Sequence, residues 1–134
     1  MENKHSENKR KRMALRQSIL SIRRNLSALD VEDAGYKIAN ILDKHPSLSQ
    51  ERIIGSYVST SGELSSRKIN EMLLKKGHIL ALPRIDIEHK GLMDFYRFNS
   101  NDKLVENRFH ILEPADNEKN FLGFEELEVL IVPL

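Results

Sequence analysis

The sequence contains no cysteine in its 134 residues. Disulfides, thiolate zinc sites, iron–sulfur clusters and cysteine nucleophiles are therefore excluded. No apolar run approaches the roughly eighteen residues that a membrane-spanning helix needs. The N-terminal segment also lacks the apolar core of a secretory signal peptide. These absences predict a cytoplasmic protein with no membrane partner.

Phosphate-binding and metal-binding motifs are absent as well. The six glycines are scattered singly, so neither G-x-x-x-x-G-K-[ST] nor G-x-G-x-x-G occurs. The five histidines show no i,i+4 pairing with one another, and we predict no metal site. The length, with 40% hydrophobic and 31% charged residues, indicates a single globular domain over residues 1–134.

The net charge of +1 conceals an uneven distribution. Residues 1–24 hold eight Lys or Arg against two Glu, a balance of +6, and the remaining residues have a balance of −5. A basic arm on an acidic body suggests phosphate, nucleotide or nucleic acid as its partner, although a solvated helix face has the same composition. Residues 1–10 are polar without periodicity, so we expect them to be disordered.

Two helices are predicted in the N-terminal part. From Arg12 onward, apolar residues recur at helical spacing, at Leu15, Ile19, Ile22 and Leu26. Ser27 resembles the N-cap of a second helix, which continues to about Lys44 and stops at His45-Pro46. Together these helices predict an N-terminal helical hairpin.

After residue 50 the spacing of the apolar residues changes from a helical pattern to one typical of β-strands. Residues 52–59 and 78–83 are two apolar runs, separated by a helix that begins after Ser65 or Ser66 and ends before Gly77. This β-α-β order predicts parallel strands joined by a right-handed crossover. Residues 93–98 alternate like a strand with one wetter face. The predicted fold class is α/β, a mostly parallel sheet flanked by helices, with the N-terminal helical hairpin.

The last apolar run, residues 129–134, predicts a third parallel strand that is buried on both faces. The sequence stops at the carboxyl end of this strand, the edge where open α/β sheets bind ligands. We therefore expect a domain that is truncated at its C-terminus.

One loop combines groups that bind ligands. Residues 59–65 lie between a strand and a helix start, and they supply hydroxyl groups, Gly62 and the carboxylate of Glu63. Such a loop binds ligands in many α/β proteins, but Glu63 could equally complement the helix dipole. Arg84 follows the next strand, where it could clamp an anion or pair with Asp86 or Glu88.

The order of several short motifs resembles the 5-formyltetrahydrofolate cyclo-ligase family, also called methenyltetrahydrofolate synthetases. The resemblance extends from residue 12 almost to the end of the sequence. Seven segments carry it: Arg12-Met13-Ala14-Leu15-Arg16, Tyr57-Val58-Ser59 with Gly62-Glu63-Leu64, Lys76-Gly77, Leu82-Pro83-Arg84, Met93-Asp94-Phe95, Ile111-Leu112-Glu113-Pro114 and Leu130-Ile131-Val132-Pro133-Leu134.

The resemblance implies an enzyme that uses ATP and Mg²⁺ to close 5-formyltetrahydrofolate to 5,10-methenyltetrahydrofolate. It implies that Arg12 and Arg16 contact ATP phosphates, although the first position is often lysine in the family and Lys11 is a neighbour. It further implies that Val58, Glu63 and Tyr57 contact the folate. The glycine-rich run with which the family completes its ATP and metal site has no counterpart here, and no catalytic residue is identified.

Two alternatives remain open. A non-catalytic nucleic-acid or regulatory binding module would use the basic N-terminal arm, but this arm lacks interleaved aromatic residues and a recognition motif. Another α/β enzyme acting on phosphate esters or sugar phosphates would share the strand order.

Overall fold

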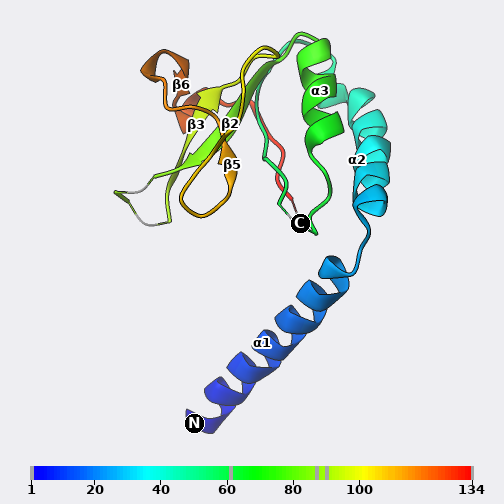
Figure 1. Cartoon of the computed structure of the whole chain (residues 1–134), viewed down its shortest axis with the longest axis vertical. Coiled ribbons are helices and arrows are strands. Elements are labelled where there is room, and N and C mark those ends of the chain that lie inside the picture. Colours follow the sequence, from blue (N-terminus) through cyan, green and yellow to red (C-terminus); the bar gives the residue numbers. More distant parts are fainter. Residues whose placement is uncertain (1, 61, 87, 90, 134) are drawn as a thin grey trace.

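The computed structural model describes residues 2–60, 62–86, 88, 89 and 91–133. Its centre is a five-stranded sheet in the order β6-β3-β2-β1-β7 (Figure 1). β1 is parallel to β2 and β7, whereas β3 is antiparallel to β2 and β6. The α/β class is confirmed, with the sheet mixed and parallel in its β2-β1-β7 part. The strands are β1 (Ile53–Gly55), β2 (Ile79–Ile85), β3 (Met93–Arg97), β6 (Phe121–Leu122) and β7 (Val129–Leu130).

Two helices cover one face of this sheet. α2 (Ala28–Asp43) and α3 (Arg67–Lys75) lie side by side (Figure 1). Ile69 and Leu73 of α3 are buried against strand residues, among them Leu80 of β2. Ser27 caps α2 as predicted, because its side-chain oxygen accepts a hydrogen bond from the Asp30 amide at 3.0 Å.

α1 (Glu2–Arg24) differs from its prediction in two respects. Residues 2–10, expected to be disordered, are helical because they are rich in strong helix formers and carry an i,i+4 ion pair between Glu7 and Lys11 at 2.8 Å. α1 does not fold back on α2 to close a hairpin. It extends away from the body instead (Figure 1).

The β1-α3-β2 unit follows its local sequence signals closely. Gly77 ends α3 in the left-handed conformation, with φ 89°. The amides of Gly77 and His78 donate to the carbonyls of Leu74 and Leu73, both at 3.1 Å. These two bonds form a Schellman motif, so the chain turns sharply into β2.

β7 pairs in parallel with β1 as predicted, but it is not buried on both faces. Leu130 is 43% exposed and Val132 58% exposed, because α2 and α3 cover only the opposite face of the sheet. Across the described residues, no helix is both long and apolar enough to cross a membrane. The short remaining elements are η1 (Pro46–Leu48), β4 (Val105–Glu106), β5 (Leu112–Glu113), η2 (Glu118–Asn120) and η3 (Phe124–Glu126).

Candidate functional site

A cavity of about 710 Å³ lies at the carboxyl ends of β1 and β2, on the sheet face that the helices leave open. Tyr57, Val58 and Glu63, the three residues predicted to contact substrate, all line it. We call it the edge cavity. Its other lining residues are mostly apolar: Ser56, Pro83, Ile85, Gly91, Leu92, Met93, Phe95, Ile111, Leu112, Glu113, Phe124, Leu130, Ile131, Val132 and Pro133.

The Tyr57 hydroxyl forms a hydrogen bond within the protein. Its hydroxyl donates to the Leu64 carbonyl oxygen at 2.6 Å, so the side chain ties the end of β1 to the segment before α3. Burial, followed by the charge of Glu63, raises the pKa of Tyr57 above its usual 10. The group therefore stays protonated at neutral pH and offers its ring to the cavity.

Glu63 closes its own loop. Its Oε1 accepts hydrogen bonds from the Thr60 amide at 2.8 Å and from the Thr60 hydroxyl at 2.6 Å. Gly62 makes this turn possible, since its φ is +82° and an added Cβ would lie 3.0 Å from the Cβ of Arg23. Among the described residues, no hydrogen bond engages Oε2, so one carboxylate oxygen of Glu63 is available to a ligand.

Glu113 is a functional candidate that the sequence indicated only as part of a family-like segment, with no role of its own. The residue is 6% exposed and lies at the wall of the edge cavity. It accepts from the Ile85 amide at 3.3 Å and lies 3.4 Å from Nη1 of Arg84. Arg84 therefore pairs with Glu113, not with Asp86 or Glu88, and it also donates to the Pro114 carbonyl at 2.7 Å. The sequence signal that could have identified Glu113 is its position as the single acidic residue in the otherwise apolar segment 111–114.

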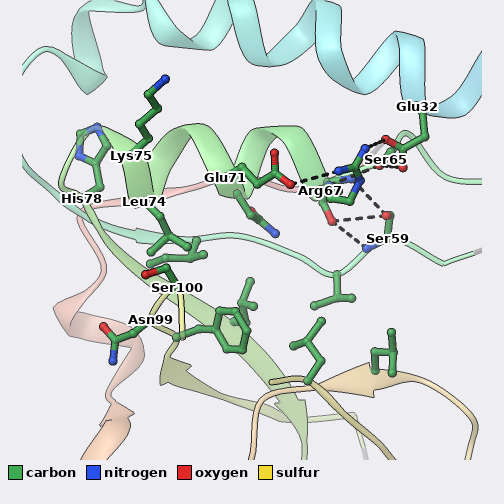
Figure 2. Close-up of a pocket in the computed structure, with 18 residues that line it drawn as sticks. Glu32, Ser59, Ser65, Arg67, Glu71, Leu74, Lys75, His78, Asn99 and Ser100 are labelled. Carbon is green, nitrogen blue, oxygen red and sulfur yellow. Dashed lines mark hydrogen bonds and ion pairs between the residues drawn. The ribbon is translucent and has the colours of Figure 1, made fainter. Parts of the chain in front are cut away.

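A second cavity, of about 810 Å³, lies beside α3 on the other face of the sheet (Figure 2). Leu80 and Leu82 line this helix-side cavity, while Pro83 and Ile85 line the edge cavity, as expected from the alternation of side chains along a strand. Val58 borders both cavities. Polar residues border the helix-side cavity as well: Glu32, Ser59, Ser65, Ser66, Arg67, Asn70, Glu71, Lys75, His78, Asn99 and Ser100.

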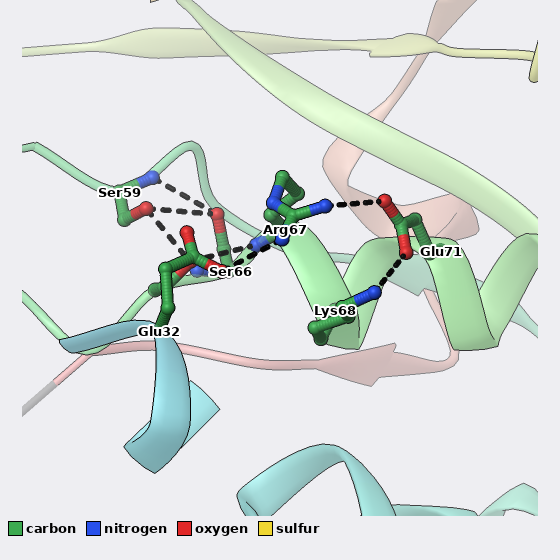
Figure 3. A network of polar contacts seen from close by, with 7 residues as sticks. Glu32, Ser59, Ser66, Arg67, Lys68 and Glu71 are labelled. Carbon is green, nitrogen blue, oxygen red and sulfur yellow. Dashed lines mark hydrogen bonds and ion pairs between the residues drawn. The ribbon is translucent and has the colours of Figure 1, made fainter. Parts of the chain in front are cut away.

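An ionic network ties α2 to the first turn of α3 (Figure 3). Arg67 donates to Glu32 at 3.0 Å and to Glu71 at 3.1 Å. Hydrogen bonds from Arg67 and then Ser65 lower the pKa of Glu32 below its usual 4.5. The network holds the two helices in register beside the helix-side cavity.

The segment that follows β1 is fixed to α3 by hydroxyl groups. The Ser59 amide donates to Ser66 Oγ at 3.0 Å, and the Ser66 amide donates to Ser59 Oγ at 3.1 Å. Ser66 occupies the predicted cap position of α3, but its hydroxyl serves Ser59 and does not cap an amide of the helix. This reciprocal pair positions the backbone around Val58.

Arg12 and Arg16 lie elsewhere. Both are exposed on α1 and neither lines the two cavities, so the structure does not bring them together with Tyr57, Val58 and Glu63. Arg12 Nε donates to the Asn8 carbonyl at 3.4 Å. Over the part of the chain that the structure describes, no cluster of three or more His, Asp or Glu could hold a metal ion. The described residues alone thus do not fit a metal site.

Comparison with known proteins identifies relatives. The model of the 5-formyltetrahydrofolate cyclo-ligase family matches residues 8–134. A protein named 5-formyltetrahydrofolate cyclo-ligase from Haemophilus influenzae is 30% identical over 131 residues, covering 95% of this chain and 68% of that protein. One of the same name from Escherichia coli K12 is 28% identical over 112 residues, covering 84% and 62%.

Two solved structures share the fold. The 5,10-methenyltetrahydrofolate synthetase of Aquifex aeolicus superposes with a TM-score of 0.74 at 24% identity, covering 90% of this chain and 59% of that one. The enzyme of that name from Mycoplasma pneumoniae gives 0.61 at 18%, covering 90% and 62%. The chain thus spans about two thirds of the curated relatives or less. From the family match over nearly all of its length, the chain belongs to the 5-formyltetrahydrofolate cyclo-ligase family.

Proposed function

We propose that the edge cavity binds 5-formyltetrahydrofolate and that the chain serves the ATP-dependent cyclisation of this substrate to 5,10-methenyltetrahydrofolate. The observation that carries the proposal is the convergence of Tyr57, Val58 and Glu63 on one cavity at the carboxyl edge of parallel strands. Its volume, about 710 Å³, lies within the range of ligand pockets. Its apolar walls suit flat heteroaromatic rings, and Glu63 Oε2 suits their N–H donors.

The reaction needs positioning more than covalent help from the protein. Transfer of the γ-phosphoryl group of ATP to the formyl oxygen releases ADP and activates the formyl carbon. N10 then attacks that carbon and loses its proton to solvent, and the C–O bond breaks as phosphate leaves. In this scheme Tyr57 and Val58 contact the folate rings while Glu63 orients them, which lowers the entropy cost of ring closure.

Arg12 and Arg16 are the proposed phosphate contacts, and α1 must approach the edge cavity for them to reach it. Because the described residues form no carboxylate cluster, we propose that Mg²⁺ binds together with the ATP phosphates. We place the reaction in the cytoplasm, where a chain without cysteine needs no disulfide.

Binding of 5-formyltetrahydrofolate, measured by titration calorimetry, tests the proposal. Glu63→Gln keeps the size of the side chain but weakens charge-assisted hydrogen bonds, so affinity should fall by about tenfold. Glu118→Gln, the same change at an exposed residue of η2 outside both cavities, should bind like the unmodified chain. Absence of binding to the unmodified chain, or equal loss in both variants, would overturn the assignment.

A nucleic-acid or regulatory module remains the second candidate, and the solvent exposure of the basic α1 favours it. It predicts duplex DNA affinity that falls with salt at a slope of about −0.9 per phosphate neutralised. Undetectable duplex binding, together with weaker ATP binding in the Arg12→Ala/Arg16→Ala variant, would reject this candidate.

A further inference from the structure

The β4-β5 hairpin forms part of the wall of the edge cavity although it lies outside the five-stranded sheet. Among the described strands, β4 and β5 pair only with each other. Ile111, Leu112 and Glu113 of this hairpin nevertheless line the cavity, as does Ile85 of β2. Because no backbone hydrogen bond between described residues joins 105–114 to the sheet, side chains must fix the position of this wall.

Glu113 fastens the hairpin to the end of β2. Its Oε2 accepts a hydrogen bond from the Ile85 amide at 3.3 Å, and its Oε1 lies 3.4 Å from Nη1 of Arg84. Arg84 also donates to the Pro114 carbonyl at 2.7 Å. These contacts are largely buried, since the side chains of Arg84 and Glu113 are 20% and 7% exposed. They join the end of β2 to the end of β5.

Asn107 extends this connection to the turn of the hairpin. Its Oδ1 accepts hydrogen bonds from the Phe109 amide at 2.8 Å and from the Ile111 amide at 3.1 Å. Its Nδ2 donates to Oε2 of Glu113 at 3.1 Å. The acceptor therefore faces two amides and the donor faces a carboxylate, so both polar atoms of the side chain are used. One side chain thus links the Glu113 carboxylate to Ile111 of the cavity wall.

The backbone of the turn also depends on Asn107. His110 has φ 60°, a left-handed conformation that is unfavourable for a residue other than glycine. The His110 amide donates to the Asn107 carbonyl at 3.0 Å, and the Asn107 amide donates to the Ile111 carbonyl at 2.9 Å. Three-residue hairpin loops commonly place a left-handed residue before the second strand. The direction in which the chain enters β5 is therefore set by bonds to Asn107.

We propose that Asn107 is a positioning residue for ligand binding, which through Glu113 holds Ile111 and Leu112 in place as a wall of the edge cavity. This role rests on the proposed function and names the residue that prepares its binding site. Asn107 does not line the cavity, so it acts through these neighbours and not by touching the ligand. A wall that is already in place lowers the free-energy cost of ordering the site on binding.

A purely structural role for Asn107 would be confined to the turn, and one substitution separates the two roles. Asn107→Asp retains the oxygen that accepts from the Phe109 and Ile111 amides, so the turn should persist. It replaces the donor with a second carboxylate oxygen that faces Oε2 of Glu113, where like charges repel. The variant should therefore release the wall from β2 and leave the turn formed.

Titration calorimetry with 5-formyltetrahydrofolate tests the proposal on variants that circular dichroism shows to be folded. Asn107→Asp should weaken binding by about tenfold or more. Asn101→Asp, the same change at an exposed residue outside both cavities, should bind like the unmodified chain. Asn107→Ser adds no charge, keeps a short acceptor for the turn and lacks the amide donor. It should also weaken binding, and it provides the test if Asn107→Asp does not fold.

Proton–nitrogen NMR spectra locate the effect within the cavity. Saturating ligand should shift the amide signals of Val58 and Ile111 in the unmodified chain, because both residues line the cavity. In Asn107→Asp or Asn107→Ser the shift at Val58 should persist, whereas the shift at Ile111 should shrink. Urea denaturation of the same variants measures any separate loss of stability.

The outcomes distinguish this role from the proposed function. If the unmodified chain binds no 5-formyltetrahydrofolate, the proposed function fails and the role of Asn107 fails with it. If the unmodified chain binds and the folded Asn107 variants keep both the affinity and the Ile111 shift, the positioning role alone is wrong. A lower stability without a change in affinity would then assign Asn107 to the turn only.

Discussion

Asn70 of α3 donates a hydrogen bond from Nδ2 to the Tyr57 carbonyl oxygen at 3.0 Å, while its Oδ1 accepts from the Ser56 hydroxyl at 2.6 Å. One side chain thus fixes the backbone at the point where the chain leaves β1. Because Tyr57 lines the edge cavity, Asn70 positions the cavity wall without lining it.

Asn70→Ala should therefore weaken binding of 5-formyltetrahydrofolate and lower stability. Loss of both bonds leaves the Ser56 hydroxyl and the Tyr57 carbonyl without partners, at a cost of about 1–3 kcal/mol. Urea denaturation and titration calorimetry measure the two effects. Asn40→Ala, at an exposed position of α2, is the matched control; it should leave binding unchanged and should not lower stability. Unchanged binding in Asn70→Ala would mean that Asn70 does not position the cavity.

Glu113→Ala should be severely destabilising. Its carboxylate is buried and engages Arg84 at 3.4 Å and the Ile85 amide at 3.3 Å, so removal leaves a largely buried cation unpaired. We expect a loss of about 3 kcal/mol, measured by urea denaturation. Glu118 on η2 is exposed, so the free energy of unfolding of Glu118→Ala should stay within about 0.5 kcal/mol of that of the unmodified chain. Equal stability of the two variants would refute the structural role of the Glu113 pair.

Gly35→Ala should destabilise the chain even though alanine favours helices. A Cβ at Gly35 would clash with the Ser65 carbonyl oxygen, a backbone atom that cannot move aside without shifting the loop before α3. Thermal melting should show a lower Tm. By contrast, Asn40→Ala on the same helix should raise Tm slightly through helix propensity. A higher Tm for Gly35→Ala would show that α2 and the loop separate easily.

His78 should make stability depend on pH. Burial, followed by the nearby charge of Lys76, lowers the pKa of His78 below its usual 6.5 in the folded chain. As pH falls below about 6.5, the unfolded chain binds a proton that the folded chain does not, so the free energy of unfolding decreases. Well above that pH neither the folded nor the unfolded chain binds this proton, so His78 no longer lowers the free energy of unfolding.

Melting curves between pH 7.5 and 5.5 measure this dependence. In the unmodified chain, His78 Nδ1 accepts a hydrogen bond from the Arg52 amide at 3.1 Å. His78→Asn retains an acceptor for this amide and should flatten the pH profile. His5→Asn on the exposed α1 should leave the profile as it is. If both variants keep the original slope, a group other than His78 is responsible.

Local signals in the sequence were sufficient wherever neighbouring residues satisfy one another. Ser27 caps α2, Gly77 ends α3, and the β1-α3-β2 unit follows from the two apolar runs on either side of an amphipathic helix. These features depend on hydrogen bonds and periodicity within a few residues, so they can be predicted from the sequence without knowledge of the fold. The family, too, followed from the order of short motifs along the chain.

Tertiary structure decided the rest, because it depends on which distant residues meet. Arg84 pairs with Glu113, far along the chain, although carboxylates stand two and four residues away from it. The run at 129–134 has the composition of a buried strand, yet Leu130 is exposed because none of the helices among the described residues packs on that face. The periodicity of α1 predicted an apolar side, but only the fold showed that this side lies apart from the body, since packing and not propensity places a helix.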